Sequence, residues 1–335
     1  MKQPVFILST GRCGSTMLSE MLAECKQVLM LSEFLVSLSP GAFPKRRLDG
    51  SEFWKLLSTP RLKYSTLIEN NIAPKEMLYA HSSRRSAQER VPPLLLVTLP
   101  FLSESPRELF DWLEPQIRDR AEMPVVQHYA ALFELLKAKL GRDLVIERSG
   151  GSLRFAAKLY RMFPEATFVH LFRNGPDCAQ SMSRHPSFRL AALIERARPT
   201  LLVDPFHTVR RPEGPLADGI KAILPESFDP DYVMNTKIDL AEFGRLWSVL
   251  VAHGVATLRR IPERQVISLR YEDLVADPAA MLGGLAQRLG LSDGDWLRRA
   301  AAKPDLGRSS QPALAHPRDL RDACQVGMRL LGYDP

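Results

Sequence analysis

The sequence VFILSTGRCGST at residues 5–16 decides the fold of this chain. Val5 to Leu8 form a short, continuous apolar run, as expected for a strand that is buried on both faces of a parallel sheet. The following residues, 9–14, are polar and include two glycines, and apolar residues then recur at helical spacing over residues 15–26. A strand, a glycine-containing loop and a helix in this order predict the start of a β-α-β unit.

The same alternation continues along the chain. Short apolar runs predict further strands at residues 28–31, 144–146, 167–172 and 266–269. Amphipathic runs predict helices at residues 129–140, 153–162, 176–184, 241–260 and 278–289. This alternation favours a three-layer α/β/α fold with a central parallel sheet. Ligands of such sheets bind at the carboxyl ends of the strands, which here are followed by residues 9–16, 32–34, 147–152, 173–181 and 270–273.

Two regions do not follow this alternation. Residues 91–102 are apolar but interrupted by prolines, and we expect a loop or a strand edge there. Seven prolines fall between Pro186 and Pro230, which is typical of an insert or lid and not of a sheet. We therefore expect one domain over residues 1–335, with a helical or loop insert at about residues 186–240.

The charge balance favours an anionic partner. Lys and Arg number 45 against 38 Asp and Glu, which gives a formal net charge of +7. Such an excess attracts multiply charged ligands, among them nucleotides, nucleic acids and membrane surfaces. The basic residues are scattered and form no run of the kind that binds nucleic acid, so we expect no nucleic-acid partner.

The cysteines and the lengths of the apolar runs indicate in which cellular compartment the protein resides. None of the four cysteines belongs to a CxxC pair, so the sequence predicts neither a zinc site nor a redox pair. Their number suits the reduced thiols of a cytoplasm. A membrane span needs roughly 18 consecutive apolar residues, and the sequence contains no such run. The first apolar run is also too short for the apolar region of a signal peptide. We expect a cytoplasmic protein.

The first loop has the chemistry of a phosphate site. The N–H groups at the start of a helix attract anions, and Gly11 and Gly14 allow the backbone to approach them closely. Ser15 and Thr16 add hydroxyl donors, and Arg12 adds a fixed positive charge. The loop lacks the lysine of a Walker A motif. The alternative interpretation is a simple strand-to-helix turn with a capping serine.

This loop resembles the 5′-phosphosulfate loop of sulfotransferases, especially those of the bacterial branch. In that family Lys or Arg, a small residue, Gly, Ser or Thr, and Thr follow the first strand, and residues 12–16 match this order. The resemblance implies that the loop binds the donor 3′-phosphoadenosine 5′-phosphosulfate (PAPS). The donor-binding residues that it implies are Gly11, Arg12, Cys13, Gly14, Ser15 and Thr16.

A second segment, residues 168–181, carries the same resemblance. In sulfotransferases a strand ends in an arginine and a serine follows eight positions later, and both hold the 3′-phosphate of PAPS. Arg173 and Ser181 have this spacing. An arginine offers donors in a rigid fork that suits phosphate, and a helix serine can complete the contact. Alternatively, these are a surface arginine and an ordinary helix serine.

Two further segments are similar to this family. Residues 270–278, RYEDLVADP, correspond to a stretch after a late strand, and the resemblance places Tyr271 near the adenine. Asp273 and Asp277 are expected to cap helices. Residues 147–153 correspond to an element between the donor and acceptor sites. Arg148 there either contacts a phosphate or the acceptor, or is the partner of an ion pair.

The resemblance implies a P-loop-like fold and transfer of a sulfuryl group from PAPS to a hydroxyl of a small molecule, sugar or lipid. The product of the donor is then adenosine 3′,5′-bisphosphate (PAP). Arg12 and the loop N–H groups would stabilise the leaving phosphate, and the insert would cover the acceptor. No metal is needed in principle, and the sequence contains no cluster of ligands for one.

The base that accepts the proton of the acceptor hydroxyl is expected to be Glu33, which follows the second strand. Some branches of the family have a glutamate there, whereas others have a histidine in a Thr-His-Leu-Pro stretch. Residues 98–100, Thr-Leu-Pro, resemble that stretch without the histidine, which favours Glu33 over His128 and His185. The alternative for Glu33 is a solvated or ion-paired carboxylate.

Two other classes of function remain open at this point. One is a nucleotide-dependent kinase or NTPase with a degenerate phosphate loop, for which the lysine of the Walker motif is missing. The other is a non-catalytic nucleotide-binding module with the same fold. Binding of PAP discriminates them, because a sulfotransferase recognises the 3′-phosphate whereas a kinase prefers ATP with magnesium.

Overall fold

The computed structural model describes residues 2–81, 90–202, 204–206, 215–292, 294–303 and 316–333. Its centre is a five-stranded sheet in the order β2-β3-β1-β4-β5, and every neighbouring pair is parallel. The strands are β1 (Val5–Leu8), β2 (Val28–Ser32), β3 (Leu144–Arg148), β4 (Thr167–Phe172) and β5 (Val266–Arg270). The predicted parallel α/β fold is confirmed, and all five predicted strands are present.

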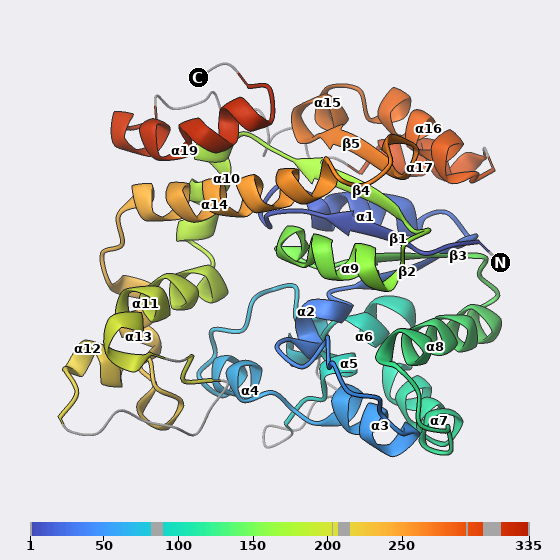
Figure 1. The fold of residues 1–335 in the computed structure, drawn as a ribbon, viewed down its shortest axis with the longest axis horizontal. Helices are drawn as coiled ribbons and strands as arrows, with labels where there is room; N and C mark the ends of the chain where they lie inside the picture. Colours follow the sequence, from blue (N-terminus) through green and yellow to red (C-terminus); the bar gives the residue numbers. More distant parts are fainter. Residues whose placement is uncertain are drawn as a thin grey trace.

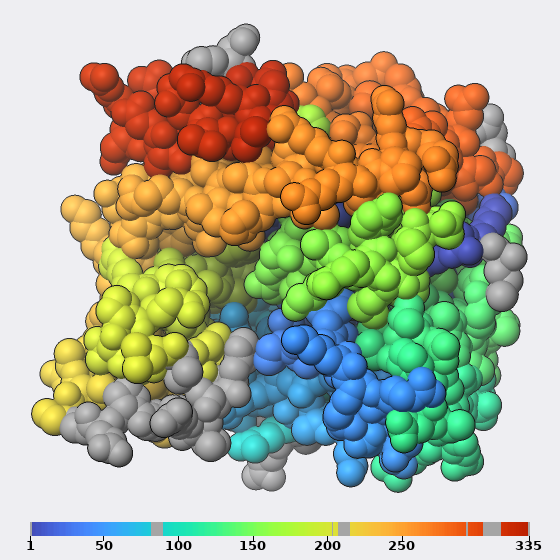
Figure 2. Space-filling view, in the orientation of Figure 1, coloured from blue at the N-terminus to red at the C-terminus, as the bar shows by residue number. Residues whose placement is uncertain are grey.

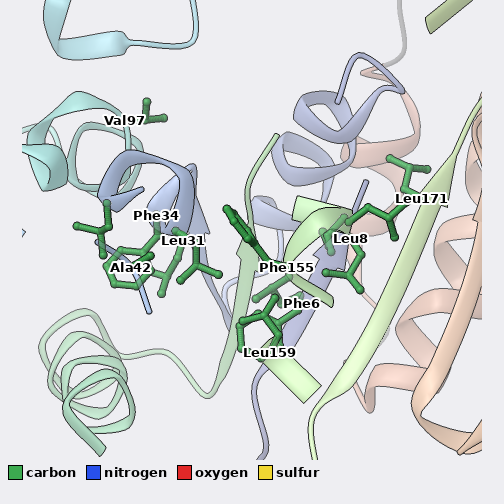
Figure 3. Close-up of a cluster of buried hydrophobic side chains, with 14 of the residues drawn as sticks. Phe6, Leu8, Leu31, Phe34, Ala42, Val97, Phe155, Leu159 and Leu171 are labelled. Atoms are coloured by element: carbon green, nitrogen blue, oxygen red, sulfur yellow. The ribbon is translucent and has the colours of Figure 1, made fainter. Parts of the chain in front are cut away.

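Strand β1 lies in the middle of the sheet and is buried along its whole length. Its register pairs Val5 with Ile146 on one side and with Thr167 on the other. Side chains from β1 and its neighbours meet those of helices in the core that Figure 3 draws, where Phe6, Leu8 and Leu171 are labelled. A strand that is buried on both faces needs apolar residues at every position, which explains the unbroken run VFIL.

Helices cover both faces of this sheet (Figure 1). On the face that is turned to the viewer lie α9 (Ala156–Met162) and α14 (Leu240–Leu258), and α1 (Ser15–Ala23) lies behind the sheet. The other helices of this part are α10 (Gly175–Ser183), α15 (Tyr271–Ala276), α16 (Pro278–Leu289), α17 (Asp295–Ala301) and α19 (Arg318–Leu330). Among the described residues, none of the helices has both the length and the apolar character to cross a membrane.

The segment between β2 and β3 is helical and packs beside the β2 edge of the sheet (Figure 1). It consists of α2 (Phe34–Leu38), α3 (Gly50–Ser58), α4 (Leu62–Glu69), η1 (Leu78–His81), α5 (Pro93–Leu96), α6 (Thr98–Leu102), α7 (Pro106–Arg118) and α8 (Val125–Leu140). The loop or strand edge that we expected at residues 91–102 is therefore wrong, since α5 and α6 occupy it. Its prolines stand at the N-cap or in the first turn of these short helices, where a backbone N–H group has no partner within the helix in any case.

The insert is helical in its described residues. It contains α11 (Pro186–Leu201), α12 (Asp218–Lys221), η3 (Pro225–Ser227) and α13 (Pro230–Asn235), and residues 203 and 207–214 lie outside the described ranges. The helix predicted at 153–162 begins as a 3₁₀ turn, η2 (Ser152–Phe155), and continues as α9. The remaining short 3₁₀ turn, η4 (Glu263–Gln265), leads into β5.

Trp247 is the largest fully buried side chain, and it lies where α10, α14 and α19 meet. Two glycines make room for its ring. An added Cβ at Gly175 would lie 2.5 Å from the ring, and one at Gly327 would lie 2.4 Å from it. The close approach of α10 and α19 to α14 therefore depends on residues without a side chain at these two positions.

We expect Gly327→Ala to destabilise the fold, because the new methyl group would overlap with the Trp247 ring. Overpacking of this kind costs ~1–3 kcal/mol of unfolding free energy. The matched control is Gly284→Ala in α16, where an added Cβ meets nothing within 4 Å and helix propensity favours alanine by up to ~1 kcal/mol. Chemical denaturation of both variants checks this, and equal stability of the two would contradict the packing argument.

Candidate active site

The five segments that we selected after the strands lie at one edge of the sheet, because all the strands are parallel. Hydrogen bonds join the segments after β1 and β3: the Ser9 N–H donates to Ser152 Oγ at 3.2 Å, and the Leu153 N–H donates to the Ser9 carbonyl at 3.0 Å. The segments after β4 and β5 also meet, since the Asn174 N–H donates to a Glu272 carboxylate oxygen at 3.0 Å. This edge is the expected place for a ligand.

The first loop has the backbone of an anion site. Gly11, Arg12 and Gly14 all have left-handed conformations, with φ angles of 81°, 59° and 86°. Turns that contain such residues can present successive backbone N–H groups as a concavity that binds anions. A Cβ at Gly11 would lie 2.7 Å from the Phe188 ring, and one at Gly14 would lie 2.4 Å from the Tyr271 ring. Both glycines are therefore required by close contacts as well as by conformation.

Arg148 connects this loop with Glu33. It ends β3, and its side chain is almost completely buried. Its Nε donates to Ser15 Oγ at 3.1 Å, and its two Nη groups contact Thr16 Oγ1 and Glu33 Oε1. Of the two interpretations of Arg148, the structure shows the ion pair, with Glu33 as its partner.

Glu33 stands at the end of β2, directly before α2. Its backbone has a φ of 55°, which is rare for a residue with a side chain and common at functional sites. In addition to the contact of Glu33 with Arg148, the Glu33 Oε2 accepts a hydrogen bond from the Gly150 N–H at 3.0 Å. The Thr98 hydroxyl donates to the Ser32 carbonyl at 2.9 Å, so the Thr-Leu-Pro stretch does lie beside Glu33.

Arg173 and Tyr271 form the wall of the site next to the first loop. The guanidinium carbon of Arg173 lies 4.4 Å from the centre of the Tyr271 ring. One Nη of Arg173 is 3.4 Å from Asp177, whereas its Nε is buried and has no hydrogen-bond partner among the described residues. A buried donor without a partner is costly, and an anionic ligand oxygen would satisfy it.

Arg12 and Ser181 are in direct contact. The Arg12 Nε donates to Ser181 Oγ at 3.2 Å, and Arg12 Nη1 forms an ion pair with Glu76 at 2.6 Å. Glu76 also lies 3.7 Å from His185, which precedes the insert helix. Its interaction with His185 and the charge of Arg12 hold the pKa of Glu76 well below its usual range. Sequence reasoning missed Glu76, because it lies in a region without a periodic pattern.

Glu147 is a second carboxyl group that sequence reasoning did not select. It is fully buried, and burial raises its pKa to about 8. Its Oε1 accepts the Leu35 N–H at 3.2 Å and the Ser149 hydroxyl at 2.5 Å, which fixes the start of α2. His128 is buried away from this edge, stacked on Phe53 and 2.8 Å from the Leu48 carbonyl, so its surroundings are structural.

The chain was compared with solved structures, and the first of the following shares its fold. The sulfotransferase domain from the curacin biosynthetic pathway has a TM-score of 0.55 and 15% identity, over 100% of this chain and 99% of that one. A sulfotransferase from Alicyclobacillus acidocaldarius has a TM-score of 0.44 and 16% identity, over 100% and 98%. Retinol dehydratase in complex with androsterone and PAP has a TM-score of 0.34 and 14% identity, over 89% and 63%. At such identities only the fold is compared.

The sequence itself was also compared with known proteins. No curated protein sequence matches the chain significantly. The profile of the sulfotransferase family matches residues 4–200, which is more than half of the 335 residues and includes the first loop, Arg148, Arg173 and Ser181. With its P-loop-like parallel sheet, this chain belongs to the sulfotransferase family.

Proposed function

We propose that this sulfotransferase takes its sulfuryl group from PAPS, releases PAP, and transfers the group to a hydroxyl of its acceptor. The observation that carries the proposal is the convergence of donors at the first loop. Arg12 contacts Ser181, and the buried Nε of Arg173 has no described partner. These groups come from β1 and from the β4–α10 segment, and they suit a ligand with phosphates at both ends of its ribose.

Arg173 and Ser181 are the proposed ligands of the 3′-phosphate. The guanidinium carbon of Arg173 lies over the Tyr271 ring, and this contact leaves the N–H donors of the guanidinium available for phosphate oxygens. The loop from Gly11 to Thr16 is the proposed site of the 5′-phosphosulfate. Tyr271 touches both sites, since its ring also closes over Gly14, and we place the adenine near this ring.

Arg12 is proposed to stabilise the oxygen that leaves with the nucleotide. PAPS supplies an activated sulfuryl group, and as the acceptor oxygen bonds to sulfur, the electron pair of the broken bond passes to the 5′-phosphate oxygen. The Nη2 of Arg12 has no hydrogen-bond partner among the described residues and is available for this charge. The N–H groups of the first loop would stabilise the same negative charge.

Glu33 is proposed to accept the proton of the attacking hydroxyl. A carboxylate has about four lone-pair directions, and the contacts with Arg148 and Gly150 use two of them. The ion pair with Arg148 fixes the orientation of the Glu33 carboxylate. Glu33 therefore offers an aligned hydrogen-bond acceptor, while Arg148 holds it at a set place relative to Ser15 and Thr16.

The insert is proposed to cover the acceptor within a single domain of residues 1–335. Phe188 near the start of α11 packs against Gly11 of the first loop. Arg189 anchors the insert, because its Nε donates to the Val233 carbonyl at 2.7 Å and its Nη1 to the Ser183 carbonyl at 2.9 Å. We place the enzyme in the cytoplasm, where its four buried free thiols would stay reduced.

The donor is tested by the melting temperature of the purified protein with PAP, with ATP and magnesium, and with adenosine 5′-monophosphate. Binding to the native state stabilises the protein by ~2.7 kcal/mol when the ligand concentration is a hundredfold above Kd. This stabilisation raises the melting temperature. We expect the largest shift with PAP. A shift with ATP and magnesium alone would instead indicate a kinase.

Arg173→Ala should weaken PAP binding roughly 10- to 100-fold, because a charged hydrogen bond is worth about 1.5–3 kcal/mol. Its affinity for adenosine 5′-monophosphate should change little, since that nucleotide has no 3′-phosphate. Calorimetric titration measures the affinity for each nucleotide. The control is Arg161→Ala, which removes an exposed arginine of α9. An equal loss for both nucleotides would contradict the assignment of Arg173 to the 3′-phosphate.

Glu33→Gln should leave PAP affinity within about twofold and lower kcat roughly 100-fold or more, as expected for the loss of a general base. The glutamine keeps the shape of the side chain and an oxygen for Arg148. Transfer from radiolabelled PAPS to a hydroxyl acceptor found by screening gives kcat. Glu165→Gln, at an exposed glutamate, is the control; full activity of the Glu33 variant would assign the base elsewhere.

A further inference from the structure

Glu76 is the charged partner of Arg12, and no step of the proposed reaction uses it. Its Oε1 lies 2.6 Å from Arg12 Nη1, and the two side chains are 24% and 31% exposed. The other described contact of the guanidinium is neutral, from Nε to Ser181 Oγ at 3.2 Å. A hydrogen bond between two ionised groups is stronger than one to a hydroxyl, and partial burial reduces the screening of its charges by salt. Glu76 is therefore the stronger of the two contacts that hold the Arg12 side chain.

Short helices attach the backbone around Glu76 to the sheet. The Met77 N–H donates to the Pro74 carbonyl at 2.9 Å, and the Met77 side chain is buried. The 3₁₀ turn η1 begins at the next residue and packs against α5 and α6, and α6 packs against β2. The Glu76 carboxylate therefore projects from a packed support, which suits a residue that holds another side chain in place.

The start of the insert encloses Glu76 from another side. Glu76 Oε2 lies 3.7 Å from His185 Nε2, and the His185 and Phe188 rings meet edge to face with their centres 5.4 Å apart. Phe188 in turn packs against Gly11 of the first loop. Figure 2 shows the surface hollowed between the insert and α9, so the insert stands apart from α9 on this face. Glu76 thus lies where the segment before η1, the insert and the first loop meet.

Arg12 needs a fixed partner if it is to act on one defined oxygen. An arginine side chain has many rotamers and loses much freedom when it is ordered, so a single neutral hydrogen bond orders it poorly. The hydroxyl of Ser181 is, moreover, the proposed ligand of the 3′-phosphate. Glu76 binds Nη1 and leaves Nη2 of the same planar fork without a partner among the described residues. The Glu76 contact therefore fixes the guanidinium and still leaves a donor for the ligand.

We propose that Glu76 is a positioning residue for the transfer: it holds Arg12 through Nη1, so that Nη2 stays directed at the oxygen that leaves with the nucleotide. This inference rests on the proposed function, in which Arg12 stabilises that oxygen. Glu76 touches neither the donor nor the acceptor and acts only through Arg12. Its own negative charge repels the anionic donor, so Glu76 weakens donor binding while it speeds the transfer.

The test replaces Glu76 by glutamine, which keeps the shape of the side chain and removes its charge. We expect Glu76→Gln to lower kcat roughly 10- to 100-fold, because a small displacement of a catalytic group costs up to about 10²-fold in rate. PAP affinity should equal or exceed that of the wild type, because a negative charge beside an anionic ligand is removed. Transfer from radiolabelled PAPS to a hydroxyl acceptor found by screening gives kcat, and calorimetric titration gives the PAP affinity.

Two comparisons show whether Glu76 acts through Arg12. The matched control is Glu114→Gln, which removes a carboxylate that pairs with Arg118 at 2.8 Å within α7, and it should change neither kcat nor PAP affinity. In protein that already carries Arg12→Ala, Glu76→Gln should change kcat by less than about twofold, because residues that act as a unit have non-additive effects. The same loss of kcat in both backgrounds would contradict action through Arg12.

Further outcomes would overturn the proposal. An unchanged kcat of the Glu76→Gln variant is one, and a joint loss of kcat and PAP affinity is another, because it would show a merely structural role. The contact is also measured without any ligand: the unfolding free energies of Arg12→Ala, Glu76→Gln and the double variant should be non-additive, and additive values would contradict the ion pair. Failure of PAP to bind the wild type would contradict the donor assignment instead, and this cycle would still test the contact.

Discussion

The buried guanidinium of Arg148 is the interaction on which the rest of the site depends. It lies at the end of β3, next to the central strand, and reaches Ser15 and Thr16 on one side and Glu33 on the other. A buried charge that loses its partner costs several kcal/mol, so the ends of β1, β2 and β3 are held in one arrangement. The first loop and the proposed base are two ends of a single network of charged and hydroxyl groups.

The sequence predicted the sheet well and the helical segment between β2 and β3 poorly. Runs such as VFIL identify buried strands because full burial demands apolar residues at each position, and Arg173 and Ser181 follow from fixed spacing after such a strand. Residues 91–102 were misjudged because proline signals a break only inside a helix, and α5 and α6 are hardly longer than a first turn. Glu76, which pairs with Arg12, lies far from it in sequence, and no local pattern reveals such a contact.

The two arginines beside the first loop have only partial partners. Arg12 pairs with Glu76 through one Nη, and Arg173 lies near Asp177. The buried Nε of Arg173 has no acceptor among the described residues. Arginines placed in this way favour an anionic ligand, in keeping with the net charge of +7.

The ring of Tyr271 closes over Gly14 and carries Arg173 on its face. The two halves of the proposed donor pocket, one after the first strand and one after the fourth, thus share a wall that comes from a third part of the chain. A larger residue at position 14 would displace the ring, and with it the support of the arginine. Because the three residues contact one another, we expect the effects of substitutions at positions 14, 173 and 271 to be non-additive.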